Sequence, residues 1–313
     1  MNDVAEELHV VTGAFGYTGK YITERLLAAG KRVRTLTGHP DRPNPFGGSV
    51  EVARLDFNDP RELERQLCGA SVLYNTYWVR FPYGGVDFDS AIENSRTLIA
   101  AAERAAVRRI VHISITNPSL ASPLPYFHGK AVVEKFVRES TLSYAILRPT
   151  VIFGQEDILI NNIAWLLRRF PFFAVAGAGD YKLQPVFVRD VAELAVSLGM
   201  AAENVTLDAA GPEAFSYTDL VEMIRQRVAS RARIVHLSPG SVLFLGRMLS
   251  VVARDVVLTR DELDGLMADL LISQEPPRGR TRFTAWLEEN AARLGVRYAS
   301  ELRRHYRPAL EGA

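Results

Sequence analysis

Residues 8–20 read LHVVTGAFGYTGK, an apolar run that leads into three glycines at positions 13, 16 and 19. The apolar run is typical of a buried strand, and residues 18–29 have the pattern of an amphipathic helix. In this order of strand, loop and helix, Gly13 can form the tight turn out of the strand, Gly16 lets the backbone approach a diphosphate, and Gly19 allows the helix to pack against the sheet. The amide N–H groups at the helix start would face the anion, so the stretch predicts a nucleotide-binding turn rather than a purely structural one.

The rest of the first half repeats this alternation of short β-branched runs and longer helical patterns. Such alternation predicts an α/β fold of Rossmann type, a doubly wound parallel sheet whose ligand edge lies at the carboxyl ends of the strands. The strands are expected at residues 8–12, 33–37, 50–55, 72–75, 110–113 and 144–147, and the helices at 18–29, 60–67, 87–105 and 129–140.

After residue 149 the pattern is less regular and mostly helical. We expect a nucleotide-binding domain in residues 1–149 and a smaller mixed or helical substrate-side subdomain in residues 150–313, part of which returns to the main sheet. Its expected elements are helices at 161–170, 189–200, 217–229, 241–252, 259–271 and 284–294, and a strand at 205–208.

The composition narrows the classes of protein. A chain of 313 residues is expected to form two domains or one large α/β unit. Its 37 basic and 36 acidic side chains give a net charge of +1, too weak a field to collect nucleic acid or anionic lipid. No stretch reaches the roughly 18 apolar residues of a membrane helix, the acidic residues 1–7 lack the pattern of a secretory signal, and a single cysteine, Cys68, fits a reducing compartment. These features predict a soluble cytoplasmic protein with no nucleic-acid partner and no membrane insertion, whose oligomeric state is open.

The basic residues after the second predicted strand bear on the choice of cofactor. Residues 33–39 contain no acid where an NAD-binding fold would place one to hold the ribose 2′-hydroxyl. Arg34, His39 and Arg42 are available instead, and guanidinium groups pair well with a 2′-phosphate. NADP(H) is therefore preferred, and NAD(H) stays possible because Asp41 could reverse the preference.

Further cofactor contacts are expected along the same edge. Phe15 and Tyr17 lie within the glycine loop, Asp56 closes the third predicted strand near the adenine, Asn75 ends the fourth, and Pro149 follows the sixth. The alternative for Asp56 is an ordinary position next to a helix cap.

A candidate chemical centre follows the fifth predicted strand. Tyr126 and Lys130 are four residues apart, so on a helix they share one face. A nearby ammonium lowers the pKa of a tyrosine from about 10, and the lysine can also hydrogen-bond the nicotinamide ribose. Ser114 and Thr116 place hydroxyls at the strand end, where one can polarise a substrate oxygen. The alternative is that Tyr126 packs on the wall of the cleft and Lys130 lies on the surface.

The substrate side is expected to be aromatic. Tyr77 and Trp78 follow the fourth predicted strand, and together with Phe153 and Trp165 they could line an apolar pocket for a flat small molecule. The alternative is that these rings pack between the two lobes. The six histidines are scattered singly, without ligand spacing, so no metal site is expected.

These segments resemble the extended and atypical short-chain dehydrogenases/reductases. The resemblance rests on the glycine loop, on Tyr126-x-x-x-Lys130 and on LRPTVIFG at residues 147–154, while PVFVRDVA (185–192) and GPEAFSY (211–217) resemble the branch of NmrA-like proteins and of the NAD(P)-binding accessory subunit of complex I. It covers roughly residues 8–230. In the extended group the fifth strand usually ends in serines, the last of them catalytic, which implies that role for Thr116, with Ser114 two residues earlier.

The resemblance implies an NAD(P)-binding fold more sharply than a reaction, because this branch contains reductases and epimerases beside members that only bind the cofactor. The leading hypothesis is an NADP(H)-dependent oxidoreductase of a small carbonyl, enone or quinone-like substrate, in which Tyr126 donates the proton. The alternatives are a non-catalytic regulatory or assembly protein and a redox-neutral epimerase or dehydratase. The loop 117–125 is shorter than in sugar-nucleotide epimerases, which disfavours a nucleotide-sugar substrate.

Overall fold

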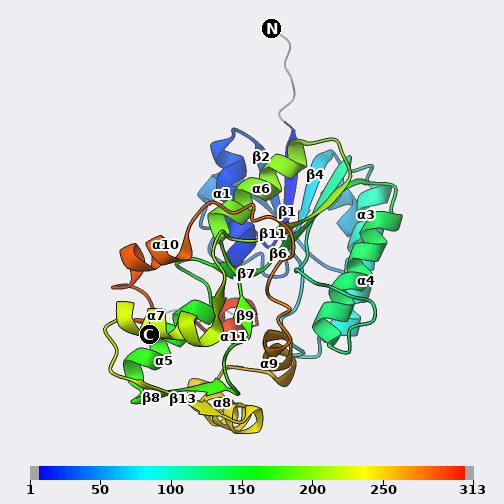
Figure 1. The fold of residues 1–313 in the computed structure, drawn as a ribbon. Coiled ribbons are helices and arrows are strands. Elements are labelled where there is room, and N and C mark those ends of the chain that lie inside the picture. Colours follow the sequence, from blue (N-terminus) through cyan, green and yellow to red (C-terminus); the bar gives the residue numbers. More distant parts are fainter. Residues whose placement is uncertain (1–6, 307–313) are drawn as a thin grey trace. The chain divides into compact units, whose positions relative to one another are not determined.

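The computed structural model describes residues 7–306 and divides them into two units (Figure 1). Unit 1 contains the chain up to Arg148 and returns with Val191–Leu207, and unit 2 contains Pro149–Asp190 and the chain from Asp208 onward. The start of the acidic stretch in which we expected no secretory signal, residues 1–6, lies outside the described residues.

Unit 1 is built on a seven-stranded sheet in the order β11-β6-β5-β4-β1-β2-β3. The strands are β1 (Leu8–Thr12), β2 (Arg32–Thr37), β3 (Val50–Arg54), β4 (Ala70–Asn75), β5 (Arg109–Ile113), β6 (Ser143–Pro149) and β11 (Val205–Ala209). All the pairings from β6 across to β3 are parallel. β1 and β5 are buried along their whole length, which explains their nearly continuous apolar sequences. The predicted α/β fold is confirmed.

Helices connect these strands, and a 3-10 turn, η1 (Gly47–Ser49), precedes β3. The helices are α1 (Tyr17–Ala28), α2 (Pro60–Leu67), α3 (Phe88–Arg104), α4 (Pro125–Glu139) and α6 (Val188–Met200). Apolar side chains of α2, α3 and α4 pack in one cluster with alternate strand residues such as Val10, Leu73 and Ile110. Helix α4 begins four residues before its predicted start, because Pro125 occupies the first turn, where its missing N–H costs nothing.

A buried arginine anchors the segment that returns to unit 1. Arg109 is fully buried, and its guanidinium donates to the carbonyl oxygens of Leu198 (2.7 Å), in the last turn of α6, and of Glu203 (2.8 Å), in the loop that follows. A cation at this end of a helix satisfies carbonyls that have no partner within the helix. The contact holds the end of α6 against β5 and leads the chain into β11.

In the part of the chain that the structure describes, unit 2 combines three small sheets with six helices. The strands pair as β7 (Val151–Phe153) with β10 (Pro185–Phe187), β9 (Lys182–Leu183) with β12 (Phe215–Ser216), and β8 (Phe172–Ala176) with β13 (Arg233–Leu237). The helices are α5 (Leu159–Arg169), α7 (Tyr217–Arg227), α8 (Pro239–Ala253), α9 (Arg260–Met267), α10 (Phe283–Asn290) and α11 (Glu301–His305). The sequence indicated the main helices but not these strands, because strands of two to five residues carry little periodic signal and pair with distant segments.

Candidate functional site

The glycine loop joins β1 to α1 through a tight turn. Gly13 has a φ of +67°, a conformation that favours glycine, and its amide donates to the carbonyl of Leu36 at 2.8 Å. The amide of Ala14 donates to Oγ1 of Thr35 at 3.0 Å. Two neighbouring positions of β2 therefore fix the path of the chain as it leaves β1.

The third glycine is required by close packing, and the helix start suits an anion. A Cβ atom on Gly19 would lie 2.3 Å from the carbonyl oxygen of Gly13, so only glycine lets α1 pack on the loop at this distance. Gly16 is the N-cap of α1; among the described residues no side chain caps the helix there, and its first turn holds no acid. Amides at an uncapped helix start are available to a diphosphate, and Phe15 and Tyr17 flank them with half-buried side chains. The loop therefore fits the diphosphate of a dinucleotide.

The loop after β4 is tied directly to the end of β1. The amide of Thr76 donates to Oγ1 of Thr12 at 2.7 Å, and Oγ1 of Thr76 donates to the carbonyl of Thr12 at 2.6 Å. Asn75 is fully buried; its carbonyl group accepts from the amide of Tyr77, and its amide group donates to Nδ1 of His112 at 3.1 Å. The hydrogen-bonding groups of the Asn75 side chain thus have partners within the protein. These hydrogen bonds connect the carboxyl ends of β1, β4 and β5.

The candidate contacts for a 2′-phosphate differ in their surroundings. Arg34 lies inside β2, and its guanidinium donates to the carbonyl of Gln66 (2.6 Å) and pairs with Glu51 (2.8 Å). His39 and Arg42 lie in the loop after β2, where the amide of Arg42 donates to the carbonyl of His39. Arg34 is therefore held by neighbouring structure, while His39 and Arg42 lie beyond the carboxyl end of the strand.

The segment after β3, which we expected near the adenine, contains a contact between two aromatic rings. Asp56 accepts a hydrogen bond from the amide of Asn58 at 3.0 Å, so it stabilises the turn that follows β3. Next to it, Phe57 packs on the ring of Tyr77 with their centroids 4.7 Å apart. Asn94 donates to the Tyr77 hydroxyl at 2.8 Å, so Tyr77 is fixed at both its ring and its hydroxyl.

Tyr126 and Lys130 both lie in α4 and meet at Trp78. The ring of Tyr126 packs edge-on against Trp78 (6.1 Å) and against Phe88 (6.1 Å). Nζ of Lys130 lies 4.9 Å from the centre of the Trp78 ring and donates to the carbonyl of Ile113, the last residue of β5, at 2.9 Å. The loop after β4 thus supplies the indole that contacts both proposed catalytic residues.

Burial dominates the electrostatics of Lys130. Only 3% of Lys130 is exposed, and burial lowers its pKa to about 7, with Glu134 opposing this shift. His112 is fully buried nearby, and burial lowers its pKa to about 3, so His112 is neutral at physiological pH. Lys130 can therefore exchange its proton near neutral pH, which is unusual for a lysine.

A buried ion pair supports α4 one turn further along. Glu134 is 1% exposed, and Arg148 donates to it through Nε (2.8 Å) and a terminal nitrogen (2.6 Å), while Arg138 donates at 2.7 Å. Burial opposes ionisation of Glu134, but the hydrogen bonds from Arg148, Ser114 and Arg138 hold its pKa below the usual value. Our interpretation of the sequence missed this carboxylate, although Glu134 continues the four-residue spacing of Tyr126 and Lys130 and could have been found from it.

The two proposed hydroxyl groups are placed differently. The amide of Ser114 donates to the carbonyl of Leu147 at 2.8 Å, and its hydroxyl interacts with Glu134, so Ser114 is engaged in the support of α4. Thr116 follows two residues later and is fully buried.

The other proposed residues lie in unit 2 or at its border. Phe153 is fully buried and packs against Phe187, Phe283 and Trp286 at centroid distances of 5.1 to 5.4 Å, so it presents no surface to a ligand in this structure. Trp165 is half-buried. Its ring packs on Phe170 and Tyr298, and Pro149 ends β6 in a buried position.

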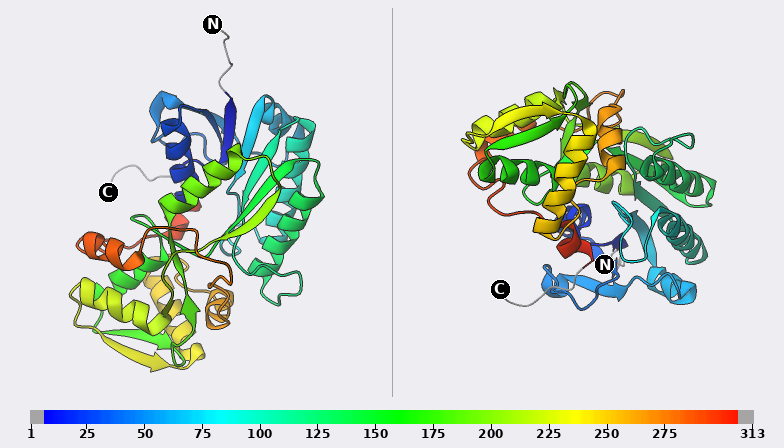
Figure 2. Two further views of the ribbon diagram at one scale, coloured as in Figure 1. Left: turned by 45° about the horizontal axis from the view of Figure 1, so that its top comes forward. Right: turned by 90° about the horizontal axis from the view of Figure 1, so that it is seen from below.

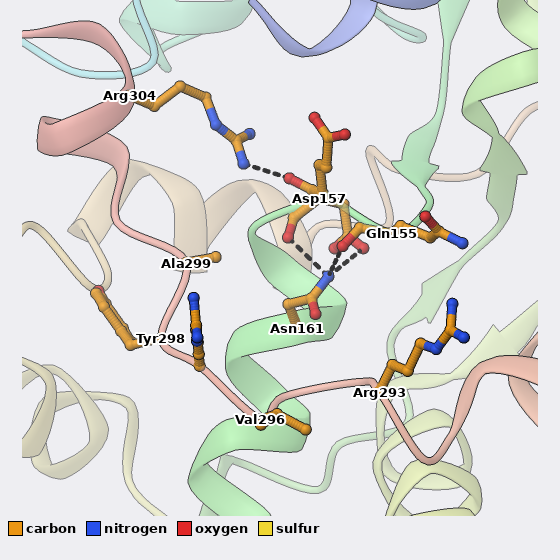
Figure 3. Close-up of a pocket in the computed structure, with 10 residues that line it drawn as sticks. Gln155, Asp157, Asn161, Arg293, Val296, Tyr298, Ala299 and Arg304 are labelled. Atoms are coloured by element: carbon orange, nitrogen blue, oxygen red, sulfur yellow. Dashed lines mark hydrogen bonds between the residues drawn. The ribbon is translucent and has the colours of Figure 1, made fainter. Parts of the chain in front are cut away.

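Unit 2 also contains a cavity of about 310 Å³ around the start of α5 (Figure 3). Asp157 is 2% exposed and accepts from the amides of Ile160 (2.7 Å) and Gly154 (3.3 Å) and from the side chain of Asn161 (3.1 Å). Burial raises the pKa of Asp157 to about 6, against the effect of these hydrogen bonds. Arg293 and Arg304 reach the same cavity from opposite sides of this turn, as Figure 3 shows.

The part of the chain that the structure describes contains neither a metal-binding cluster nor a membrane-spanning helix. Within residues 7–306, no group of three or more His, Cys, Asp or Glu side chains could hold a metal ion. None of the helices described in that range is both long and apolar enough to cross a membrane. Cys68 is exposed and caps the carboxyl end of α2.

Curated relatives include a subunit of a respiratory enzyme and a reductase. The chain is 25% identical over 238 residues to NADH dehydrogenase (ubiquinone) 1 alpha subcomplex subunit 9 of Arabidopsis thaliana, covering 72% of this chain and 59% of that protein. It is 26% identical over 250 residues to the ceramide reductase of Caulobacter vibrioides, covering 76% of each. The chain thus spans little more than half of the Arabidopsis subunit.

Solved structures confirm the fold. The NADPH-dependent quinone oxidoreductase of Escherichia coli, solved with NADPH, superposes with a TM-score of 0.72 at 20% identity and covers 91% of this chain and 99% of its own. A nucleoside-diphosphate-sugar epimerase of Staphylococcus aureus superposes with a TM-score of 0.71 at 15% identity, covering 85% and 92%.

A family model described as NAD(P)H-binding matches residues 13–159, from the first glycine of the loop to the start of α5. The match contains both the glycine loop and the pair Tyr126 and Lys130. Residues 13–159 of this chain are therefore similar to the NAD(P)H-binding family.

Proposed function

We propose that the chain is an NADP(H)-dependent oxidoreductase that acts on a small carbonyl, enone or quinone-like substrate. The observation that carries the proposal is the arrangement in α4, where Tyr126 precedes by one turn a buried Lys130 whose pKa is lowered to about 7. A perturbed group beside a proton donor is typical of an active site. A lysine with a purely structural role is normally exposed or paired with a carboxylate. The Nζ atom of Lys130 is buried and hydrogen-bonded to a backbone carbonyl instead.

The residues of the chain would divide the work as follows. The uncapped first turn of α1 and the glycine loop would hold the diphosphate, and the bound cofactor would supply the hydride. Tyr126 would donate its phenolic proton to the substrate oxygen, and the charge of Lys130 would stabilise the phenolate until water restores the proton. The buried Thr116 and the support of Ser114 for Glu134 would fix the end of β5 beside them.

The preference for NADP(H) is part of the same proposal. It rests on His39 and Arg42 beyond the end of β2 and on the absence of an acid in residues 33–39. Arg34 contributes less, because Glu51 and the carbonyl of Gln66 already engage it.

A second candidate function is a cofactor-binding protein without turnover, favoured by the position of Trp78. Its indole lies over the Lys130 ammonium, and that lysine has almost no exposed surface. A lysine buried in this way offers almost no surface to a ligand in this structure. The relatives that are subunits of NADH dehydrogenase agree with such a role.

Replacing Tyr126 with phenylalanine separates the two functions. We expect Y126F to lower the rate of NADPH oxidation with a panel of quinones and enones by at least about 100-fold, since a positioned proton donor contributes on that scale. The affinity for NADPH, measured by fluorescence titration, should not change. Y83F, which removes the hydroxyl of an exposed tyrosine, is the matched control.

The contrary results are distinct. Wild-type turnover in Y126F would show that Tyr126 is not the proton donor. The non-catalytic function would be established if the wild type binds NADPH but oxidises it with no member of the panel. The W78A variant, in which Lys130 is no longer under the indole, should then show no oxidation either. Oxidised cofactor retained through purification would point to the redox-neutral alternative.

A further inference from the structure

Helix α8 exposes an unusual amount of apolar surface. Of its 15 residues only Gly246 is buried, while Phe244 is 63% exposed, Val251 77% and Val252 78%. Leu245 and Met248 are also among the exposed large apolar side chains. A surface helix normally turns such residues toward the core, so a contiguous set on the outside indicates an interaction surface.

The five side chains form one stripe. At 3.6 residues per turn, positions 244, 245, 248, 251 and 252 fall within about 120° of the helix circumference. Arg247 lies about 40° beyond one edge of the stripe, and Arg254 follows directly after the end of the helix. The helix is therefore apolar on one face, with an arginine at the border of that face.

The charged side chains of the chain segment that contains α8 are all of one sign. Between Glu222 and Asp255 the chain has no acidic residue. The same span contains six arginines, at positions 225, 227, 231, 233, 247 and 254. The balanced net charge of +1 thus hides a strongly basic segment of 32 residues.

Only part of this basic charge is neutralised. Arg225 pairs with Glu222, and Arg227 pairs with Glu288. Arg231, Arg233 and Arg247 are exposed and have no ion pair among residues 7–306. Asp255, the acid that ends the segment, is 5% exposed and accepts from the amides of Glu301 and Leu302, so it does not offset the surface charge.

The strands beside α8 extend the surface. Arg233 on β13 stands opposite Phe172 on β8, and Phe172 is 48% exposed. In unit 2 α8 runs alongside β8 and β13, as Figures 1 and 2 show. Apolar and basic side chains are therefore combined on helix and sheet alike.

We propose that α8 and the basic side chains Arg231, Arg233 and Arg247 form a docking surface for an anionic lipid bilayer. An interfacial helix buries its apolar face at the boundary of headgroups and acyl chains, while arginines bind the lipid phosphates. The absence of acidic side chains over 32 residues selects this occupant, since a surface that pairs with protein usually mixes charges of both signs. A helix of 15 residues is too short to span a bilayer, so α8 lies along its surface. The proposal does not depend on the proposed function, because it involves none of the residues of the cofactor site.

The test is vesicle flotation with the full chain. We expect binding to vesicles of phosphatidylcholine with about one third phosphatidylglycerol, no binding to pure phosphatidylcholine, and weaker binding as salt rises from about 0.1 M to 0.5 M. F244E should weaken binding by roughly ten-fold or more, because it removes a phenyl group that the bilayer would bury and adds a negative charge. R233Q and R247Q should each weaken binding about five-fold.

The controls isolate the surface. L120E makes the same kind of change at an apolar side chain that is 53% exposed in unit 1, and it should bind vesicles like the wild type. Circular dichroism and NADPH affinity should be unchanged in F244E, since its ring is mostly in solvent.

Three results would overturn the proposal. They are equal binding to both kinds of vesicle, equal loss in F244E and L120E, and a lipid-free wild-type dimer that F244E dissociates without any binding to vesicles. The last result would assign α8 to contact with a second copy of the chain.

Discussion

Replacing Lys130 with methionine should stabilise the protein at low pH and leave its stability nearly unchanged at pH 9. Burial lowers the pKa of Lys130 from its usual 10.5 to about 7, so the folded protein binds fewer protons than the unfolded chain between these values. The stability of the wild-type protein therefore rises as the pH increases through this window, and the cost of the buried charge is largest below pH 7.

The size of the effect follows from the linkage relation. From pH 6 to pH 9 the wild-type protein should gain about 3 kcal/mol relative to K130M, since methionine does not titrate. At pH 6 the buried charge costs about 5 kcal/mol, and at pH 9 protonation of the lysine in the unfolded chain alone costs about 2 kcal/mol. Against this stands about 2 kcal/mol for the carbonyl of Ile113, which K130M would leave without a donor. K130M should thus be about 3 kcal/mol more stable than the wild type at pH 6 and about equally stable at pH 9.

Urea denaturation at four pH values between 6 and 9, followed by circular dichroism, measures these differences. Hydrogen exchange of amides in β5 and α4 assigns them to unit 1. K135M is the matched control, because Lys135 lies in the same helix with a side chain that is 55% exposed, and its difference from the wild type should not vary with pH. A constant difference between the wild type and K130M across the range would refute the reasoning, since Lys130 would then keep an ordinary pKa.

Four further results are expected. G19A should lower NADPH affinity by about ten-fold or more and lower the melting temperature, because its Cβ would meet the Gly13 carbonyl at 2.3 Å; an unchanged dissociation constant would contradict the packing argument. R42Q should weaken NADPH about ten-fold and leave NADH unaffected, and equal loss for both would remove Arg42 from the 2′-phosphate site. R148M should cost about 3 kcal/mol in urea denaturation, because Glu134 would lose a bidentate partner while buried; a cost below about 1 kcal/mol would show that Arg138 suffices. Because burial raises the pKa of Asp157 to about 6, its carboxylate is destabilising above that pH, so the wild type should lose about 2 kcal/mol relative to D157N between pH 4 and pH 7; parallel stability profiles would exclude this.

The buried lysine and its tryptophan also bear on function. A protein under selection for stability alone would replace Lys130 by an apolar residue of similar shape, since buried charges seldom add net stability. Keeping the lysine at this cost is expected if it acts on Tyr126. The position of Trp78 over Lys130 then sets the condition for direct contact between this lysine and a ligand.

Some of the elements predicted from the sequence agree with the structure, and others were missed. The boundaries of β1, α2 and β5 agree with the sequence to within a residue, because each segment has a strong apolar period and a clear start or stop signal. The small sheets of unit 2 were missed, because their short strands pair across long separations, such as Phe172 with Arg233.

The sequence alone determined the glycine turn, the alternation that builds the parallel sheet, and the spacing that puts Tyr126 and Lys130 on one helix face. These features are local, since they depend on backbone conformation and on periods of a few residues. Only the tertiary structure decided that Trp78, 52 positions before Lys130, covers that ammonium, that Phe153 is buried in the core of unit 2, and that Arg34 is held by Glu51. Burial and contact depend on which distant segments the fold brings together, and no local pattern encodes the path of the loop that places them.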